Sequence, residues 1–162
     1  MTRSRVLVVV IVIAAASIGG WRLGEARRTA TTQWAVVDVL DGDTIRVARG
    51  DDTDTVRLLG INTPETHHPR KPVECFGPEA AAYTDAQLRG RAVGLEADIE
   101  ERDRYDRRLA YVIVDGERFN DELLRRGYAR LLVIEPNHAH ARAMLQEELD
   151  AKRAGRGLWG EC

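Results

Sequence analysis

The sequence predicts a domain that is mainly β with α (α+β), built as a five-stranded OB-fold Greek-key barrel with about three helices packed outside. Three observations predict it. Strand patterns follow one another at the start of the domain, a helix pattern separates the third strand from the fourth, and another helix pattern closes the chain. A small Greek-key barrel satisfies this order of elements.

The first three strands form an expected antiparallel meander. They are predicted at 34–40, 44–48 and 55–61. The first is rich in β-branched residues, and the second alternates apolar and polar residues as a half-buried strand does. Asp41-Gly42 supplies the first turn, and residues 50–54 form a loop.

The remaining elements follow from the same kinds of pattern. Residues 62–76 contain three prolines and no period, which predicts a long loop. A helix is expected over 79–89, with Pro78 at its start and Gly90 at its end. Further strands are expected at 91–99, 109–114 and 128–134, a tight turn at 115–116, and helices at 121–126 and 137–154 with Asn120 and Asn137 as N-caps.

Length and composition exclude several classes of protein. A chain of 162 residues suits one domain with a sizeable core. With 44% hydrophobic and 31% charged residues, it matches neither a disordered chain nor a coiled coil. Two cysteines are too few for a disulfide scaffold or a cysteine-rich zinc site. The 19 basic and 25 acidic side chains of residues 31–162 give a formal charge of −6, which argues against coating nucleic acid by bulk positive charge.

The first 21 residues have the layout of a secretory signal peptide. Arg3 and Arg5 precede an apolar run, and Ala14–Ala16 offers an A-x-A-like cleavage site. The apolar stretch of about 16 residues is short for a membrane span, which needs about 20. Trp21 followed by Arg22 resembles an interfacial boundary, so an uncleaved membrane anchor is the alternative.

These features predict an exported protein, secreted or anchored to the outer face of the cytoplasmic membrane. The predicted organisation is a signal peptide or anchor over 1–21, a linker over 22–33 and a folded domain over 34–162. We expect the domain to act as a monomer, with a membrane as partner only if the N-terminal segment is uncleaved.

Two short segments supply oxygen ligands and carboxylates. Asp41-Gly42-Asp43-Thr44 places two carboxylates two residues apart, and Asn62-Thr63-Pro64-Glu65-Thr66 adds further oxygen ligands and a third carboxylate. Taken alone, each segment is explained as a turn, and Arg57 and Arg107 are explained as solvated surface side chains. Together they supply hard oxygen ligands, a free carboxylate and two guanidinium groups.

This set of groups matches phosphodiester hydrolysis. Charge that develops on phosphate oxygens calls for a metal ion and arginine forks, and a carboxylate can take a proton from water. Zinc is disfavoured, because the histidines lack a second convincing ligand pair. The histidines are His67, His68, His138 and His140.

Three stretches of the sequence read DGDTIRV, VRLLGINTPETHHPRKPVECFGPEA and DRYDRRLAYV. Together they resemble the staphylococcal nuclease family, also called thermonuclease, and the resemblance runs from about Trp34 to Trp159. The resemblance implies an OB-fold barrel and Ca²⁺-dependent cleavage of DNA and RNA. It also implies that the 5′-oxygen leaves and a 3′-phosphate remains.

The resemblance also implies a metal site and a catalytic set. Asp43 falls on a calcium ligand with Asp41 supporting it, and Asn62 and the backbone carbonyl of Thr63 fall on the other protein ligands. Glu65 falls on the general base that activates water. The two phosphate-binding catalytic arginines are Arg57 and Arg107.

The same resemblance implies further contacts with the substrate, and two departures from the family. Arg104 and Tyr105 resemble residues that hold a terminal nucleotide phosphate, and Lys71 lies in the loop facing nucleic acid. Asn62 stands where the best-known member has Asp, so one ligand charge is missing. Residues 131–135 are one residue shorter and lack the tyrosines that flank the bound base.

Two questions stay open in the sequence. Cys75 and Cys162 suit a disulfide in an oxidising compartment, and equally suit two unrelated thiols. A non-catalytic nucleic-acid-binding OB module is the alternative function, and a purely structural surface domain is a third. The presence of Glu65, Arg57 and Arg107 together favours the enzyme.

Overall fold

Five strands close into a barrel in the computed structural model, which describes residues 33–66 and 72–162. The strands of the barrel are β1 (Trp34–Asp41), β2 (Thr44–Arg49), β3 (Asp52–Leu58), β5 (Ala92–Glu96) and β6 (Arg108–Val114). They pair antiparallel in the order β3-β2-β1-β5-β6, and a parallel pairing between β3 and β6 closes the ring. This topology confirms the predicted five-stranded OB-fold barrel.

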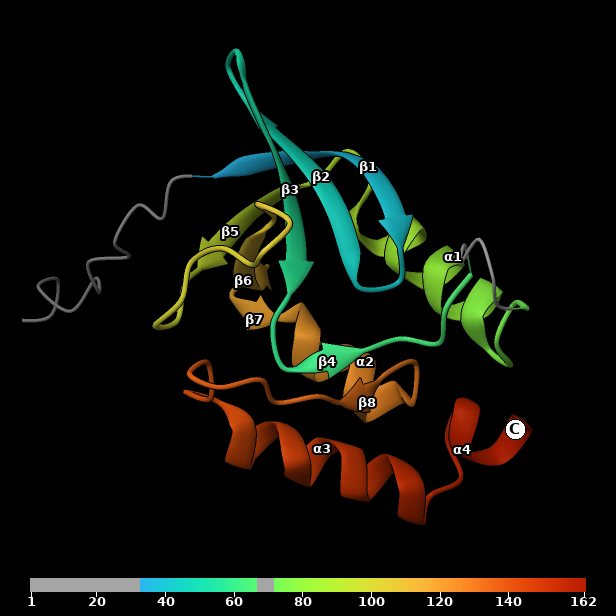
Figure 1. Ribbon diagram of the computed structural model, residues 1–162. Coiled ribbons are helices and arrows are strands. Elements are labelled where there is room, and N and C mark those ends of the chain that lie inside the picture. The colour runs from blue at the N-terminus through green and yellow to red at the C-terminus, as the bar shows by residue number, and fades with distance from the viewer. Residues whose placement is uncertain (1–32, 67–71) are drawn as a thin grey trace, which may run out of the picture.

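Helices and a small second sheet pack at one side and one end of the barrel (Figure 1). The helices are α1 (Gly77–Leu88), α2 (Phe119–Arg126), α3 (Ala141–Arg153) and the short α4 (Leu158–Glu161). The short strands are β4 (Ile61–Asn62) and β8 (Arg130–Leu131), which pair with each other, and β7 (Glu117–Arg118), which pairs with β6. In Figure 1, β4 and β8 lie between the barrel and α3. Within the described ranges, no helix is long and apolar enough to span a membrane.

Several features predicted from the sequence, including part of the 62–76 loop, fall on residues that the structure does not describe. The signal peptide or anchor over 1–21 lies outside the described residues, as does all of the 22–33 linker except Gln33. Lys71 lies outside them as well.

The third strand ends earlier than predicted, at Leu58 instead of residue 61. Gly60 has a φ of 73°, a left-handed conformation that bends the chain between β3 and β4. A Cβ at Gly60 would lie 2.6 Å from the Met144 side chain of α3, so the bend also lets α3 approach closely. The turn sends Asn62 away from the barrel sheet and into pairing with β8.

The predicted strand at 128–134 and helix at 137–154 are shorter in the structure. Only Arg130–Leu131 pairs as a strand, because β4 offers just two residues to pair with. Helix α3 begins at Ala141, and Asn137 does not cap it. Instead the Asn137 amide accepts from Glu100 N–H at 2.7 Å and donates to Glu100 C=O at 2.9 Å.

Asn120 is also not a helix cap. It is fully buried inside α2, where its side chain accepts from Val112 N–H at 2.9 Å and donates to Leu59 C=O at 2.8 Å. A side-chain amide can replace a missing peptide partner in this way, since it carries one acceptor and two donors. Asn120 and Asn137 therefore link segments that are distant in sequence instead of starting helices.

A disulfide joins Cys75, just before α1, to Cys162 at the end of the chain, with their Cα atoms 6.1 Å apart.

We predict that the Cys75→Ser/Cys162→Ser variant loses about 4–5 kcal/mol of unfolding free energy, as an upper estimate, because the bond closes a loop across 87 positions of sequence. Urea unfolding of the oxidised protein and the variant measures the difference. The two should converge when a dithiol reductant is present, and a difference below about 1 kcal/mol would contradict this prediction.

Candidate active site

One polar cavity of about 380 Å³ brings together seven of the residues singled out in the sequence. It opens where the β1–β2 turn, the end of β3 and the segment after β4 meet. The seven residues are Asp41, Asp43, Arg57, Asn62, Thr63, Glu65 and Arg107. They come from four separate stretches of the chain, so the barrel topology assembles the cavity.

Asp43 is the buried centre of this cavity, with 6% of its surface exposed. One carboxylate oxygen accepts from the Thr44 hydroxyl at 3.0 Å, and the other accepts from Thr63 N–H at 3.1 Å. That second oxygen also pairs with Arg57 Nη2 at 3.0 Å. The pairing and hydrogen bonds offset the desolvation cost of a buried carboxylate.

The turn that carries Asp43 is packed directly on Thr63. A Cβ at Gly42 would lie 2.8 Å from Thr63 Cγ2 and Oγ1, which only glycine avoids. The Thr63 hydroxyl is buried and has no hydrogen-bond partner among the described residues. Gly42 thus allows the Asp43 turn and the segment after β4 to form one wall.

Three contacts hold the guanidinium group of Arg57 in the cavity. Its Nη1 donates to Leu58 C=O at 2.6 Å, and its Nη2 also donates to Asn62 Oδ1 at 3.3 Å, beside the ion pair with Asp43. Burial lowers the pKa of Arg57, as does the nearby charge of Arg107, although Asp43 opposes the change. An arginine remains charged at neutral pH in any case. Its guanidinium group is therefore a fixed cation in the cavity.

The donor set for a metal ion is compact and made of oxygen. Asp43 offers a carboxylate, Asn62 an amide oxygen and Thr63 a backbone carbonyl, and Asn62 Nδ2 donates to that carbonyl at 3.3 Å. Hard cations such as Ca²⁺ and Mg²⁺ prefer such ligands, so the residues present fit a metal ion of this class. In the described parts of the chain, no group of three or more His, Cys, Asp or Glu side chains could hold a metal ion.

Asp41 and Glu65 add two further carboxyl groups to the lining of the cavity. Burial raises the pKa of Asp41, and the neighbouring carboxyl groups of Glu65 and Asp43 raise it further. The Gly42 N–H and the Thr66 hydroxyl act in the opposite direction, each donating at 2.9 Å. The neighbouring carboxyl groups thus make it harder for Asp41 to ionise.

Arg107 lies on the segment between β5 and β6, and its guanidinium group is oriented by Asp103. One Asp103 oxygen accepts from Arg107 Nε at 2.8 Å and Nη2 at 2.7 Å, while the other accepts from Arg107 N–H at 3.0 Å. About a third of the Arg107 side chain is exposed. The guanidinium group is therefore aligned yet still accessible to an anion.

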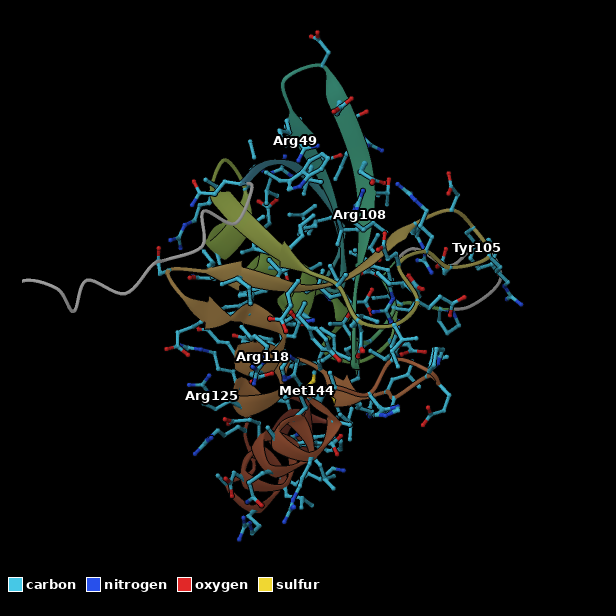
Figure 2. All side chains as sticks on the ribbon, turned by 90° about the vertical axis from the view of Figure 1, so that its left-hand side faces the viewer. Arg49, Tyr105, Arg108, Arg118, Arg125 and Met144 are labelled. Carbon is cyan, nitrogen blue, oxygen red and sulfur yellow. A yellow bond between two sulfur atoms is a disulfide. The ribbon has the colours of Figure 1, made fainter. Side chains whose placement is uncertain are left out.

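A second cavity of about 480 Å³ adjoins the first and shares Arg57 and Arg107 with it. Arg104 and Tyr105, which the family resemblance implies as substrate contacts, line this cavity. Arg104 Nη2 donates to the Tyr105 hydroxyl at 2.6 Å, and Tyr105 projects at the edge of the molecule (Figure 2). The lining of this cavity also includes six aliphatic residues: Leu58, Leu59, Ile61, Leu109, Leu132 and Ile134.

The segment that carries Arg104, Tyr105 and Arg107 is fastened to β3 by Asp54. Arg102 donates to both Asp54 oxygens at 2.8 and 3.2 Å, and Arg108 Nε donates to one at 2.9 Å. Burial alone would raise the pKa of Asp54, but the hydrogen bonds and charges of the two arginines outweigh burial and lower it.

Replacing Asp54 by asparagine tests this attachment through its pH dependence. Because the folded pKa of Asp54 is lowered, its contribution to stability is present above its unfolded pKa of about 3.9 and lost as the pH falls through the folded value. We expect Asp54→Asn to lower the free energy of unfolding by about 1 kcal/mol at pH 7, because the arginines stay partly solvated. Urea unfolding at pH 7 and near pH 2.5 should show the difference shrinking, and an equal difference at both would contradict the prediction.

Comparison with known proteins identifies the family. The family model for staphylococcal nuclease homologues matches residues 55–161. The chain belongs to the staphylococcal nuclease family. It is therefore a nuclease, a hydrolase that acts on phosphodiester bonds, and members of this family use metal ions.

Three relatives illustrate how far this similarity extends. The Thermonuclease of Staphylococcus hyicus is 37% identical over 126 residues, which cover 78% of this chain and 75% of that protein. The Thermonuclease of Staphylococcus intermedius is 36% identical over 126 residues, with the same coverage of 78% and 75%. Endonuclease YncB of Bacillus subtilis (strain 168) is 37% identical over 124 residues, which cover 75% of this chain and 59% of that protein.

Several residues that shape the site were missed in the sequence. Asp103 and Asp54 orient the arginine-bearing segment, and Glu74 lines the polar cavity beside Glu65. The four-residue spacing of Asp103 and Arg107 was a usable signal, since such pairs meet when a segment turns. Asp54 gave no such signal, because its partners lie 48 and 54 residues away.

Proposed function

We propose that this nuclease is Ca²⁺-dependent and hydrolyses phosphodiester bonds of both DNA and RNA, with the 5′-oxygen leaving and a 3′-phosphate remaining. The observation that carries the proposal is the single cavity that holds Asp43, Asn62, Thr63, Glu65, Arg57 and Arg107. A non-catalytic nucleic-acid-binding module would have no use for an acidic centre between two arginines, since acids repel phosphate.

Arg57 and Arg107 bind the oxygens of the scissile phosphate from two sides. Arg57 is fixed from below by Leu58 C=O and Asp43, and Arg107 is fixed by Asp103. Neither guanidinium group has to reorganise when charge grows on the phosphate, which is the condition under which such groups stabilise a transition state most. Glu65 accepts the proton of the attacking water, which turns the water into the nucleophile.

Asp43, Asn62 and the Thr63 carbonyl would hold Ca²⁺, with Asp41 supporting them. The ion would supply positive charge next to the phosphate oxygens on which negative charge develops. Asn62 contributes no formal charge, so the site should bind Ca²⁺ in the weak range of about 10⁻⁴–10⁻³ M typical of extracellular modules.

The neighbouring cavity receives the rest of the nucleotide. Arg104 and Tyr105 hold a terminal phosphate, and Lys71 contacts nucleic acid further along. Leu132 and Ile134 present aliphatic side chains to the base, and Tyr105 adds an aromatic ring to the same lining. Apolar and aromatic side chains contact any base, so this cavity would discriminate weakly between bases.

We further propose that the protein is exported and acts as a monomer outside the cytoplasm. Residues 1–21 serve as a signal peptide or as an anchor in the cytoplasmic membrane, residues 22–33 link them to the domain, and a membrane is a partner only for the uncleaved form. The Cys75–Cys162 disulfide supports export, because such bonds persist in oxidising compartments.

Cleavage assays test the proposed function. The protein is incubated with single-stranded DNA, plasmid DNA and RNA in Ca²⁺ or in a chelator, and the ends of the products are mapped. We expect cutting of all three substrates in Ca²⁺, 3′-phosphate ends, and no cutting in the chelator. Chelator-insensitive cleavage would overturn the metal assignment, and 5′-phosphate ends would overturn the proposed direction of cleavage.

Replacing Asn62 by aspartate tests the ligand assignment. The added charge should tighten Ca²⁺ binding by about tenfold, since more carboxylate ligands raise the affinity of such sites. Isothermal calorimetry measures the dissociation constant, with Asn62→Ala as the matched variant that should weaken it. Equal or weaker binding by Asn62→Asp would refute the role of Asn62 as a ligand.

A further inference from the structure

Glu74 lines the polar cavity of the candidate active site. The proposed mechanism assigns it no role. Glu65 lines the same 380 Å³ cavity, and nine positions separate the two residues in sequence. Two hydrogen bonds join them. Glu65 N–H donates to the Glu74 carboxylate oxygen Oε2 at 3.2 Å, and Glu74 N–H donates to Glu65 C=O at 2.9 Å.

These two bonds bracket the peptide groups on both sides of the Glu65 Cα atom. The direction of a side chain follows from the orientation of its backbone, since Cβ is fixed relative to N and C′. With both its N–H and its C=O held by one residue, Glu65 has little freedom to rotate as a unit. Its carboxylate is thereby aimed into the cavity from a constrained backbone.

Gly77 packs closely against the backbone of the segment that carries Glu65. A Cβ at Gly77 would lie 3.0 Å from Glu65 C=O and 3.1 Å from Pro64 C=O, so the first turn of α1 lies directly against this segment. Gly77 N–H donates to Glu74 C=O at 3.0 Å, which continues the connection from Glu74 into the helix. Glu74 is therefore attached to α1 on one side and to Glu65 on the other.

The disulfide fastens the same segment to the end of the chain. Cys75 follows Glu74 directly, and its partner Cys162 ends α4. That helix is itself anchored, because Leu158 is buried and its N–H donates to Gly127 C=O at 2.9 Å. Glu74 is thus held by α1 and by the adjacent disulfide, and both restrict its movement.

We propose that Glu74 is a positioning residue for Glu65, holding the Glu65 backbone through its carboxylate oxygen and its own N–H. The inference rests on the proposed role of Glu65 as general base. A carboxylate that is displaced by about 1 Å from its reacting atom can lose up to about a hundredfold in rate, so even partial loosening should be measurable.

Steady-state kinetics of the full-length oxidised protein on single-stranded DNA at saturating Ca²⁺ test this role. Glu74→Ala is expected to lower kcat about tenfold with KM within about twofold of wild type, because the chemical step and not substrate binding is affected. Glu74→Gln keeps an oxygen that accepts from Glu65 N–H and should retain kcat within about twofold. Glu79→Ala, which removes an exposed carboxylate five residues along on α1, is the matched control and should leave both constants unchanged.

A double variant separates positioning of Glu65 from general damage. Glu74→Ala should cause no further loss in a Glu65→Gln background, because a base that is absent cannot be misplaced. Multiplied losses in the double variant, or equal losses in Glu74→Gln and Glu74→Ala, would overturn the inference. So would an altered Ca²⁺ affinity of Glu74→Ala with an unchanged kcat, since Glu74 would then act through the metal.

The same experiment distinguishes failure of this inference from failure of the proposed function. Full activity of Glu65→Gln would overturn the general-base role and the inference together. Loss of activity in Glu65→Gln with full activity in Glu74→Ala would overturn the inference alone.

Discussion

Replacing Arg107 by alanine is expected to lower kcat by about 10³–10⁵-fold, the range measured for arginines that contact transferring phosphoryl oxygens. The guanidinium group is aligned in advance by Asp103, with bonds of 2.7 and 2.8 Å, so little reorganisation is needed when charge develops on the phosphate. Substrate affinity should change far less than kcat, because the interaction strengthens in the transition state. Single-turnover and steady-state kinetics on single-stranded DNA in Ca²⁺ measure both.

Two further variants make the Arg107 result specific. Arg107→Lys keeps the charge but loses the two-pronged geometry, so its activity should lie between those of wild type and Arg107→Ala. Arg91→Ala removes a surface arginine paired with Asp115 and should leave activity unchanged. If Arg107→Ala lost no more activity than Arg91→Ala, Arg107 could not be a phosphate ligand. Equal activity of Arg107→Lys and wild type would mean that charge alone is required.

The barrel was predictable from the sequence because its strands carry local signals. Alternation in 44–48, the turn at Asp41-Gly42 and the helix start at Pro78 are each set by neighbouring residues. The structure places strands and α1 at these positions, with β2 over Thr44–Arg49 and α1 over Gly77–Leu88. The positions of these strands and of this helix could therefore be predicted, because each is determined by residues within one short segment.

Elements whose cause lies in distant contacts were predicted less well. The apolar run at 128–134 looked like a strand, yet only two residues pair, and exposed Leu132 and Ile134 line a cavity instead. Asn120 and Asn137 precede helical patterns and so resembled caps, but each donates to a backbone carbonyl far away in sequence, Leu59 and Glu100 respectively. An asparagine before a helix looks the same in both cases, so local sequence cannot separate them.

The candidate site shows the same division. The identity of Asp43, Asn62, Glu65, Arg57 and Arg107 was available from motifs, and the structure brings all five into one cavity. The residues that orient these side chains could not be identified from the local sequence. The Asp54 attachment joins segments 48 and 54 residues apart, and the link between Glu74 and Glu65 depends on how the intervening chain returns.

Replacing Glu65 by glutamine is expected to lower kcat by about 10²–10⁴-fold, the usual contribution of a general base. Glutamine has nearly the same shape and leaves the backbone bonds to Glu74 in place, so the fold around the cavity should persist. The amide cannot accept a proton from water, and that step alone is lost. Any rise of kcat with pH that reports ionisation of Glu65 in wild type should disappear in the variant.

Two measurements separate loss of the base from loss of the metal. Calorimetry of Glu65→Gln with Ca²⁺ should give a dissociation constant within about threefold of wild type, since the proposed ligands Asp43, Asn62 and Thr63 are intact. Activity should stay low even at saturating Ca²⁺. If high Ca²⁺ restored activity, Glu65 would be acting on the cation and not on water, and a base would have to be sought among the other carboxylates of the cavity. Asp41, with its raised pKa and its place beside Glu65, would be the first candidate to replace.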